Sequence, residues 1–192
     1  MPHCINFRDV EAAYQRVATL VHRTPVLTSS YFSGQSGREV YFKCEAYQKT
    51  GSFKFRGASN ATAMIKESSS AASADVTVVT HSSGNHAQAL ALAAASNGVK
   101  AHIVMPDNAP EAKRRAVEET YKARVTLCEP SARAATADRV ISETPGAAFV
   151  HPSEDPRVIA GQGTVSLELV EQVPRPLDVV IIPVGGGGLA SG

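Results

Sequence analysis

Short apolar runs alternate with helical patterns over residues 76–184, and this alternation restricts the fold more than any other feature of the chain. The run VTVVT at 76–80 is β-branched, and the alanine-rich stretch at 85–97 has the composition of a buried helix. The same patterns predict strands at 100–106, 124–128, 147–151 and 178–184, and helices at 109–121, 131–143 and 157–172. Strands that alternate with helices form right-handed crossovers, so we predict an α/β fold with a parallel sheet covered on both faces.

The first 75 residues follow a less regular pattern. Apolar residues at helical spacing predict a helix at 9–21, with Asp9 as its N-cap, and EVYFKCE at 39–45 alternates as a strand does. The stretch SSSAASA at 68–74 is small and low in complexity, which predicts a flexible connector. We therefore expect a domain boundary there.

The predicted strand at 178–184 is followed by GGGGLASG, where the sequence stops. A strand that ends in glycines is expected to lead into a helix, which is barely begun here. A parallel sheet without its next crossover keeps an unpaired edge. We therefore expect the 192 residues to be a fragment or a truncated product.

Charge and cysteine content exclude several classes of protein. The formal net charge is +1, so there is no electrostatic case for binding nucleic acid or an anionic membrane. The N-terminus lacks the apolar region of a signal peptide, and no run of 18 apolar residues could span a bilayer. Three widely spaced cysteines suggest neither a disulfide framework nor a zinc site. These features predict a soluble cytoplasmic protein.

Four consecutive glycines, Gly185, Gly186, Gly187 and Gly188, follow the last predicted strand. Without side chains, the backbone can approach a ligand closely, and N–H groups at a following helix start would face an anion. The functional interpretation is a phosphate cradle, and the alternative is a loose turn. The pattern is neither G-x-G-x-x-G nor a P-loop, which argues against a dinucleotide fold and an NTPase.

The stretch THSSGNHAQ at 80–88 joins the first strand of the alternating region to its first helix. Ligands of α/β sheets bind where a strand's carboxyl end meets a helix N-terminus. Hydroxyl, amide and backbone N–H groups could hold a carboxylate there. The alternative is plain helix capping, because Ser and Asn are preferred caps. Metal binding by His81 and His86 is less favoured, since their spacing does not suit one helix face.

Lys54 stands between two phenylalanines in TGSFKFRGAS at 50–59. Burial lowers the pKa of a lysine amine because it disfavours the ammonium, and the neutral amine forms Schiff bases with aldehydes. The alternative is a lysine whose stem passes two core phenylalanines on the way to solvent. A phosphate cradle, a Schiff-base amine and a carboxylate-binding turn together match a pyridoxal phosphate enzyme that acts on an amino acid.

Four motifs in order, SFKFRGA, SSGNHAQAL, HPSEDPRVIAGQGT and PVGGGG, make the chain resemble the serine racemase and serine/threonine dehydratase group of fold-type II pyridoxal phosphate enzymes. The resemblance runs from residue 24 to the last glycine. It implies a parallel-sheet large domain with an inserted small α/β domain. Residues 1–75 would begin the large domain, 76–152 would form the small domain, and 153–192 would return to a large domain whose C-terminal part is missing.

The resemblance also implies roles for individual residues. Lys54 would be the Schiff-base lysine and would move the α-proton on one face of the substrate. Phe53 would pack near the cofactor ring, and Asn85 would donate to its phenolic oxygen. The phosphate would lie on the four glycines, and the substrate carboxylate would lie on Ser82, Ser83, Gly84, Asn85 and His86.

Ser83 distinguishes activities within this group. Dehydratases without racemase activity commonly have alanine there, whereas a serine resembles the racemases, in which the hydroxyl acts as acid and base on the face opposite the lysine. The resemblance therefore implies serine racemase activity together with serine and threonine dehydratase activity. The alternatives are a threonine dehydratase without racemase activity, and an inactive truncated chain that only associates with full-length subunits.

Further ligands and partners are implied only by the resemblance. Racemases that bind ATP use residues that match Ser29, Ser30, Tyr31, Lys49, Thr50, Gln88 and Tyr121. The family's Mg²⁺ ligands would lie beyond residue 192, so the metal ligands stay unknown. Ser153 departs from the asparagine of mammalian-type racemases near the cofactor. A homodimer is also implied.

Overall fold

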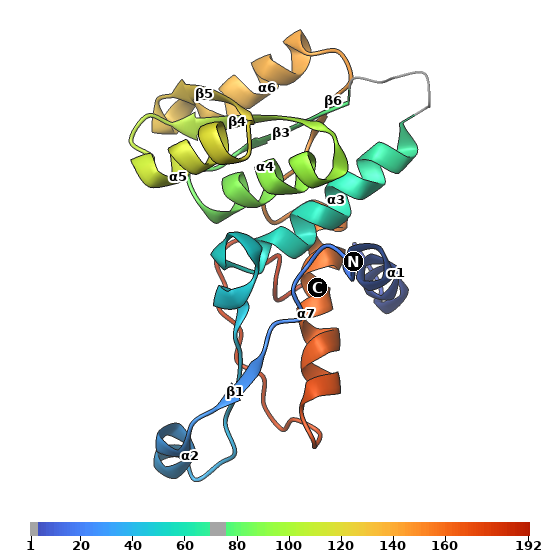
Figure 1. The fold of residues 1–192 in the computed structure, drawn as a ribbon, viewed down its shortest axis with the longest axis vertical. Coiled ribbons are helices and arrows are strands. Elements are labelled where there is room, and N and C mark those ends of the chain that lie inside the picture. Colours follow the sequence, from blue (N-terminus) through green and yellow to red (C-terminus); the bar gives the residue numbers. More distant parts are fainter. Residues whose placement is uncertain (1–3, 70–75) are drawn as a thin grey trace.

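The computed structural model describes residues 4–69 and 76–192, and its centre is a four-stranded parallel sheet (Figure 1). The strands are β3 (Thr77–His81), β4 (Lys100–Pro106), β5 (Arg124–Cys128) and β6 (Ala147–Phe149), in the order β5-β4-β3-β6. In the register of the sheet, Thr77 of β3 lies between Lys100 and Ala147 of its two neighbours. The predicted α/β fold with a parallel sheet is confirmed.

Helices cover both faces of this sheet. The helix α4 (Asn85–Asn97) covers one face and α6 (Arg133–Glu143) covers the other (Figure 1). Side chains alternate between the faces, because Val78 packs in the core on the α4 side and Val79 packs with Val140 on the α6 side. This two-faced burial explains why the strands read as continuous apolar runs.

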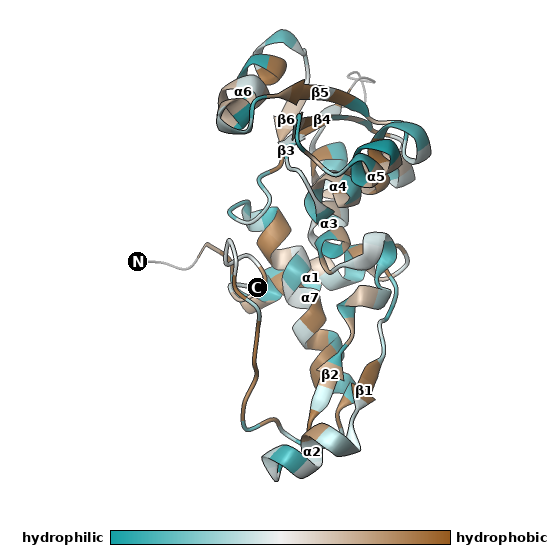
Figure 2. Cartoon of the chain, turned by 90° about the vertical axis from the view of Figure 1, so that its left-hand side faces the viewer, coloured by the Kyte–Doolittle hydropathy of each residue, from teal (hydrophilic) through white to brown (hydrophobic). Residues whose placement is uncertain are grey.

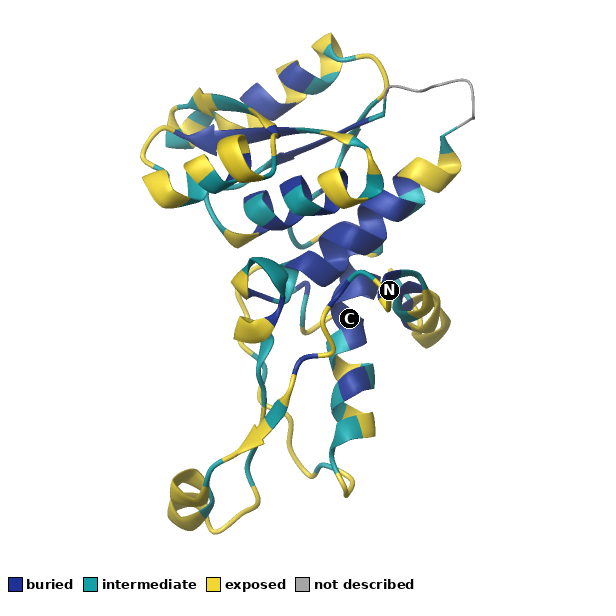
Figure 3. Cartoon of the chain, in the orientation of Figure 1, coloured by how far each residue is buried: buried dark blue, intermediate teal, exposed yellow. Residues whose placement is uncertain are grey.

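Three further helices lie below the sheet layer. They are α1 (Phe7–Val17), α3 (Lys54–Ser68) and α7 (Pro156–Gln172), and α3 packs between α4 and α7. Most of α3 is buried (Figure 3). A Cβ atom added to Gly161 of α7 would lie 2.6 Å from the Cα atom of Gly57 in α3. Glycine therefore allows the two backbones to touch where these helices cross.

A small lobe extends away from the sheet. It contains the antiparallel strands β1 (Val26–Thr28) and β2 (Tyr41–Lys43), with α2 (Ser30–Ser36) at its far end (Figure 1). Two 3-10 turns, η1 (Glu45–Tyr47) and η2 (Lys49–Gly51), lead from the lobe into α3. These turns place Lys54 at the first position of α3.

A buried ion cluster joins the lobe to α3 and α7. The guanidinium of Arg56 is fully buried and donates to both oxygens of Glu45 and of Glu168, at 2.7–2.9 Å. Lys43 of β2 donates to the second oxygen of Glu168 at 2.6 Å. Two cations and two anions balance here, which is the arrangement that buried charges require. The cluster holds the start of α3 against α7.

Several predicted boundaries are corrected. The first helix spans 7–17 instead of 9–21, and its N-cap is Asn6, while Asp9 closes the capping box. The helix predicted at 109–121 consists of α5 (Glu111–Arg115) and a π-helical turn, η3 (Ala116–Thr120). Ser68 ends α3, and the rest of the predicted connector at 70–74 lies outside the described residues.

The strand predicted at 178–184 is wrong. The segment forms no strand, and Val179 and Ile181 are 73% and 92% exposed. Figure 2 shows it as an apolar trace that runs outside the helices. A strand needs a neighbour for its backbone hydrogen bonds, and no strand of the described residues lies alongside this segment.

The predicted domain division stays a prediction. The sheet occupies 77–149, within the range 76–152 expected for a small domain, and the boundary after residue 75 falls outside the described part of the chain. Within the described part, no helix is both long and apolar enough to cross a bilayer.

Candidate active site

The amine of Lys54 lies half-buried at the start of α3. Its Nζ atom donates a hydrogen bond of 2.7 Å to the carbonyl oxygen of Pro152 and lies 5.3 Å from the ring centroid of Phe53. Among the described residues no carboxylate forms an ion pair with it. Burial alone lowers the pKa of this amine, so the neutral, nucleophilic form is favoured relative to a free lysine.

The two phenylalanines beside Lys54 do different things. Phe55 is fully buried in the core. The Nζ atom of Lys49 lies over its ring, 5.7 Å from the centroid. Phe53 is half-buried and stays beside the Lys54 amine. Only Phe53 is therefore placed to contact a ligand of Lys54, and its predicted place near a cofactor ring stays a prediction.

The turn SSGNH connects β3 to α4, as expected. The backbone N–H of Ser82 donates to Val104 at 3.0 Å, and the Ser82 hydroxyl accepts from Gly84 N–H at 3.3 Å. Gly84 is the N-cap and makes no side-chain capping hydrogen bond. The alternative of plain capping is therefore wrong, and the first N–H groups of α4 have no side-chain cap. Ser83 lies half-buried in the same turn.

His86 is 2% exposed in the first turn of α4. Its Nε2 atom lies 3.4 Å from the carbonyl oxygen of Val150, which can only accept, so Nε2 carries the proton. Burial, and then the charge of Lys54, lower its pKa to about 3. The neutral ring leaves Nδ1 as a buried acceptor with no partner. A carboxylate would therefore meet the backbone N–H of His86 and not its imidazole.

The side chain of Asn85 is exposed, and its Oδ1 atom accepts a hydrogen bond of 3.0 Å from Lys113 Nζ. The residue is at the first position of α4, at the carboxyl end of β3. Its Nδ2 group makes no hydrogen bond within the described ranges 4–69 and 76–192, so it is available as a donor.

The glycine loop packs against Ser153. A Cβ atom at Gly188 would lie 2.9 Å from the carbonyl oxygen of Ser153, and one at Gly186 would collide with the Ser153 side chain. Gly187 has φ of 82°, which favours glycine. A Cβ atom at Gly185 would meet nothing within 4 Å. Side chains are thus excluded from most of the loop, as a cradle for an anion requires.

The segment 150–153 is what brings the three motifs together. Val150 accepts from His86, Pro152 accepts from Lys54, and Ser153 packs against the glycine loop. His151 stiffens the segment, because its Nδ1 atom accepts from the backbone N–H groups of the two residues that follow Pro152, at 3.3 and 2.9 Å. The sequence indicated Ser153 only as a departure from a family pattern.

Pyridoxal phosphate fits the groups that are present. The cofactor has a phosphate for a side-chain-free loop and an aldehyde for a desolvated amine. Ser52, two residues before Lys54, is more than nine-tenths buried, and its hydroxyl has no partner. Unpartnered buried polar atoms at Ser52 and His86 suit a site that receives a polar ligand.

The seven residues matched to an ATP site do not form one cluster. The turn η2, with Lys49 and Thr50, packs against α4, which carries Gln88, and Tyr121 follows η3 beside α4. Ser29, Ser30 and Tyr31 are in or next to α2, at the other end of the lobe (Figures 1 and 2). The described residues contain no group of three His, Cys, Asp or Glu side chains arranged for a metal ion.

Sequence reasoning missed Lys113 and Arg56. Lys113 is the first of three consecutive cations, KRR, and no pattern in one sequence separates it from Arg114 and Arg115. Arg56 reads as a surface residue because arginine is almost never fully buried unless it is paired. The only signal was its place directly before Gly57, in a helix that packs closely against α7.

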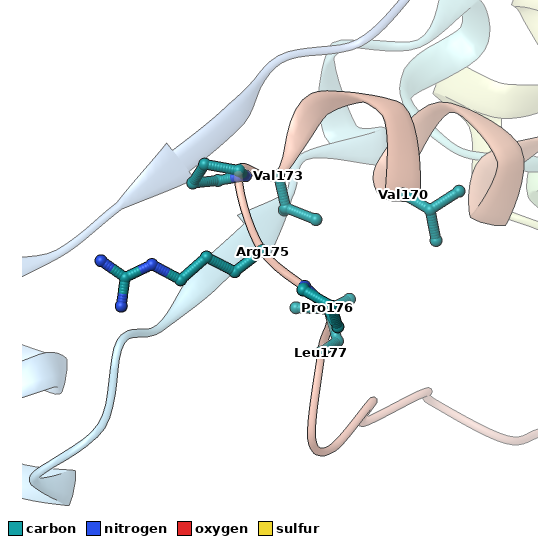
Figure 4. Close-up of a pocket in the computed structure, with 6 residues that line it drawn as sticks. Val170, Val173, Arg175, Pro176 and Leu177 are labelled. Carbon is teal, nitrogen blue, oxygen red and sulfur yellow. The ribbon is translucent and has the colours of Figure 1, made fainter.

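Two hollows lie away from this site. One of about 340 Å³ at the end of α7 is lined by Val170 and residues 173–177, with Arg175 directed away from Val170 (Figure 4). The other, of about 620 Å³, lies at the amino ends of β3, β4 and β5. Ligands of parallel sheets bind at the carboxyl ends of the strands, which excludes the second hollow. The first hollow is lined by no residue of the Lys54, His86 or glycine-loop motifs.

The comparisons with known proteins agree with this chemistry. A family model described as "Pyridoxal-phosphate dependent enzyme" matches residues 17–192. Serine racemase of Homo sapiens is 48% identical over 99% of this chain, which covers 55% of the relative. The β-hydroxyaspartate dehydratase of Paracoccus denitrificans (strain Pd 1222) is 47% identical over 97% of this chain, and the match covers 58% of the length of that relative.

The solved structures give the same result. The crystal structure of a pyridoxal 5'-phosphate-dependent aspartate racemase superposes with a TM-score of 0.91 at 42% identity, over 99% of this chain and 58% of the other. The chain thus spans little more than half the length of the curated relatives it matches.

Proposed function

Because the chain belongs to the family of pyridoxal-phosphate dependent enzymes, we propose that it acts as a serine racemase with serine and threonine dehydratase activity. One observation carries the proposal: the amine of Lys54, the turn at His86 and the glycine loop all contact residues 150–153. An amine for an aldehyde and a cradle for a phosphate therefore lie against the same short segment.

The residues that would hold the cofactor are those described above. The loop 185–188 would hold the phosphate by backbone N–H groups, because Ser153 leaves no room for side chains there. Lys54 would bind the aldehyde carbon, and Asn85 would donate from Nδ2 to the phenolic oxygen. Phe53 would contact one edge of the ring.

The substrate would be held through its carboxylate. The uncapped N–H groups at the start of α4 and the hydroxyls of Ser82 and Ser83 supply donors, with Gly84 allowing a close approach. These donors fix the α-carbon between Lys54 and the turn. His86 contributes its backbone N–H, while its neutral ring supports the turn through Val150.

The proton moves belong to Lys54 and Ser83. When bound, pyridoxal phosphate supplies an electron sink that makes the α-proton acidic. The Lys54 amine takes this proton on one face, and Ser83 returns a proton on the other face to give the opposite enantiomer. If the β-hydroxyl instead leaves as water, the resulting enamine is released and hydrolysed, and the water it takes up gives a 2-oxo acid and ammonia.

The experiment adds pyridoxal phosphate to the purified chain and follows its visible absorption. We expect a visible band that is absent in Lys54→Ala. Borohydride should bleach this band and leave the cofactor fixed on Lys54, where peptide mass locates it. No band in the unaltered chain would favour the alternative, an inactive chain that only associates with full-length subunits. Loss of racemisation with retained elimination in Ser83→Ala would support the two-face assignment, and the reverse pattern would contradict it.

A second candidate is action on acidic amino acids. Two relatives are named for aspartate or β-hydroxyaspartate, and two cations lie beside the turn. Lys113 contacts Asn85. The pKa of His81 is lowered first by burial, then by His151 and then by the charge of Arg133, so Arg133 also lies near the turn. A side-chain carboxylate of the substrate would meet this positive potential. Turnover of serine, threonine, aspartate and β-hydroxyaspartate, compared side by side, decides between the candidates.

We also propose where the protein is located, how it assembles and which further ligands it binds. A cytoplasmic location suits three free thiols, Cys4, Cys44 and Cys128. A homodimer, Mg²⁺ binding and ATP binding follow from the family resemblance, and ATP is supported by the packing of Lys49 and Thr50 against α4. Analytical sedimentation of the chain, with and without ATP and Mg²⁺, tests whether it forms a dimer and whether either ligand binds to it.

A further inference from the structure

We propose that Lys113 is a positioning residue for Asn85: it holds the amide oxygen so that the amide N–H₂ group is presented to a ligand. The inference deepens the proposed function, because it assumes that Asn85 faces the cofactor. It concerns which end of one amide points into the site, and it is open to measurement without any cofactor.

The hydrogen bond itself gives the direction. Lys113 Nζ lies 3.0 Å from Asn85 Oδ1, and it would lie 3.5 Å from a Cβ atom at Gly84. An ammonium has three donors and no acceptor, so it can bind only the oxygen end of the amide. The two ends of an amide are otherwise nearly equal in shape, and their orientation follows from the hydrogen-bond network. Lys113 therefore selects one of two orientations.

Among three consecutive cations, only Lys113 is directed at the turn. Arg115 pairs with Glu119 at 3.1 Å, and Arg114 lies 3.8 Å from Glu118, so both point along their own helix. Lys113 is half-buried in α5, which continues into the π-helical turn η3. Single π-helical turns occur frequently at functional sites, and here η3 follows the helix that carries Lys113.

The chemical consequence is a donor of fixed direction. With Oδ1 occupied, Asn85 offers Nδ2 to its surroundings, and the groups that this donor suits are anionic oxygens such as a phenolate. Without the lysine, the amide can rotate and present its carbonyl oxygen, which would repel the same ligand. A nearby ammonium adds to the positive potential at the start of α4, which favours an anionic ligand at this place.

The first test uses the chain without cofactor. Side-chain amide signals of Asn85 in a ¹⁵N–¹H spectrum are assigned by their loss in Asn85→Ala. We expect these signals to move in Lys113→Met, to stay in place in the control Arg115→Met, and to return toward their original positions in Lys113→Arg. Unchanged signals in Lys113→Met, with or without a loss of thermal stability, would overturn the proposal.

The second test uses the loaded chain. Loss of an oriented donor on the phenolic oxygen should weaken cofactor binding roughly tenfold in Lys113→Met, with recovery in Lys113→Arg. The pKa of the visible chromophore should rise, because the donor stabilises the deprotonated form. An absent band in the unaltered chain would contradict the proposed function, while the amide signals would still decide the inference about Lys113.

Discussion

The Nζ atom of Lys54 donates a 2.7 Å hydrogen bond to the carbonyl oxygen of Pro152, 98 positions further along the chain. The next residue, Ser153, fills the space beside the glycine loop. One peptide thus sets the distance between a reactive amine and an anion cradle. A shift of this peptide would move both groups relative to each other.

The contact between Gly186 and Ser153 predicts a rescue by double substitution. Gly186→Ala places a methyl group onto the Ser153 side chain, so cofactor binding should weaken roughly 5- to 150-fold, in line with overpacking costs of about 1–3 kcal/mol. Adding Ser153→Gly removes the obstacle and should restore most of the affinity, as measured by titration of the visible band. Gly185→Ala, which meets nothing within 4 Å, should cost less. Equal losses at both glycines would contradict the steric explanation.

The buried ring of His86 predicts a pH-dependent stability. Its folded pKa of about 3 lies below the ordinary 6.5, so between these values the unfolded chain binds a proton that the folded chain does not. The free energy of unfolding therefore falls as the pH falls through this window. Between pH 7.5 and 5, His86 should account for a loss of about 2 kcal/mol.

The measurement is urea unfolding of the unaltered chain and of His86→Gln at both pH values. His81 and His102 also have pKa values lowered by burial, so the difference between the two proteins isolates His86. An identical pH dependence in both proteins would mean that the ring is accessible to protons in the folded state.

The crossing of α3 and α7 predicts an intolerance of Gly161 to substitution. Gly161→Ala would place its methyl group 2.6 Å from the Cα atom of Gly57 and 2.8 Å from the carbonyl oxygen of Arg56. Because backbone cannot move aside, we expect a loss of about 3 kcal/mol in unfolding experiments. The matched control is Gly34→Ala in the exposed helix α2, where no atom lies within 4 Å. That change should stabilise by about 0.5–1 kcal/mol.

The ion cluster around Arg56 predicts a large cost for removing one carboxylate. Burial tends to raise the pKa of Glu168, but hydrogen bonds from Arg56 and Lys43 hold it below its usual value, so the group is charged. Glu168→Gln leaves two buried cations with one anion and should cost about 3–5 kcal/mol.

Glu171→Gln is the control for that change. Glu171 is on the same helix as Glu168, but it forms an exposed ion pair with Arg23. Breaking this pair should cost no more than about 1 kcal/mol. Chemical denaturation of the two variants compares them directly. Similar small losses in both would show that water reaches the cluster.

Local patterns predicted the elements of the sheet region closely. The strands at 100–106 and 124–128 and the helix at 85–97 have the bounds expected from the sequence. Each of these elements depends on periodicity within a few residues and on backbone bonds inside the element or to a neighbouring strand. The segment 178–184 has the same apolar composition and forms no strand, because a strand also needs a partner.

The sequence alone determined the chemistry that is available. It placed a lysine between aromatic residues, a Ser/Asn turn after a strand, and four glycines in a row. Tertiary structure alone decided how these groups meet: through residues 150–153, through Lys113 instead of its two neighbours, and through the buried Arg56 cluster. The reason is physical, since contacts between segments 28 to 112 residues apart are set by the packing of whole elements and leave no periodic signal in the chain.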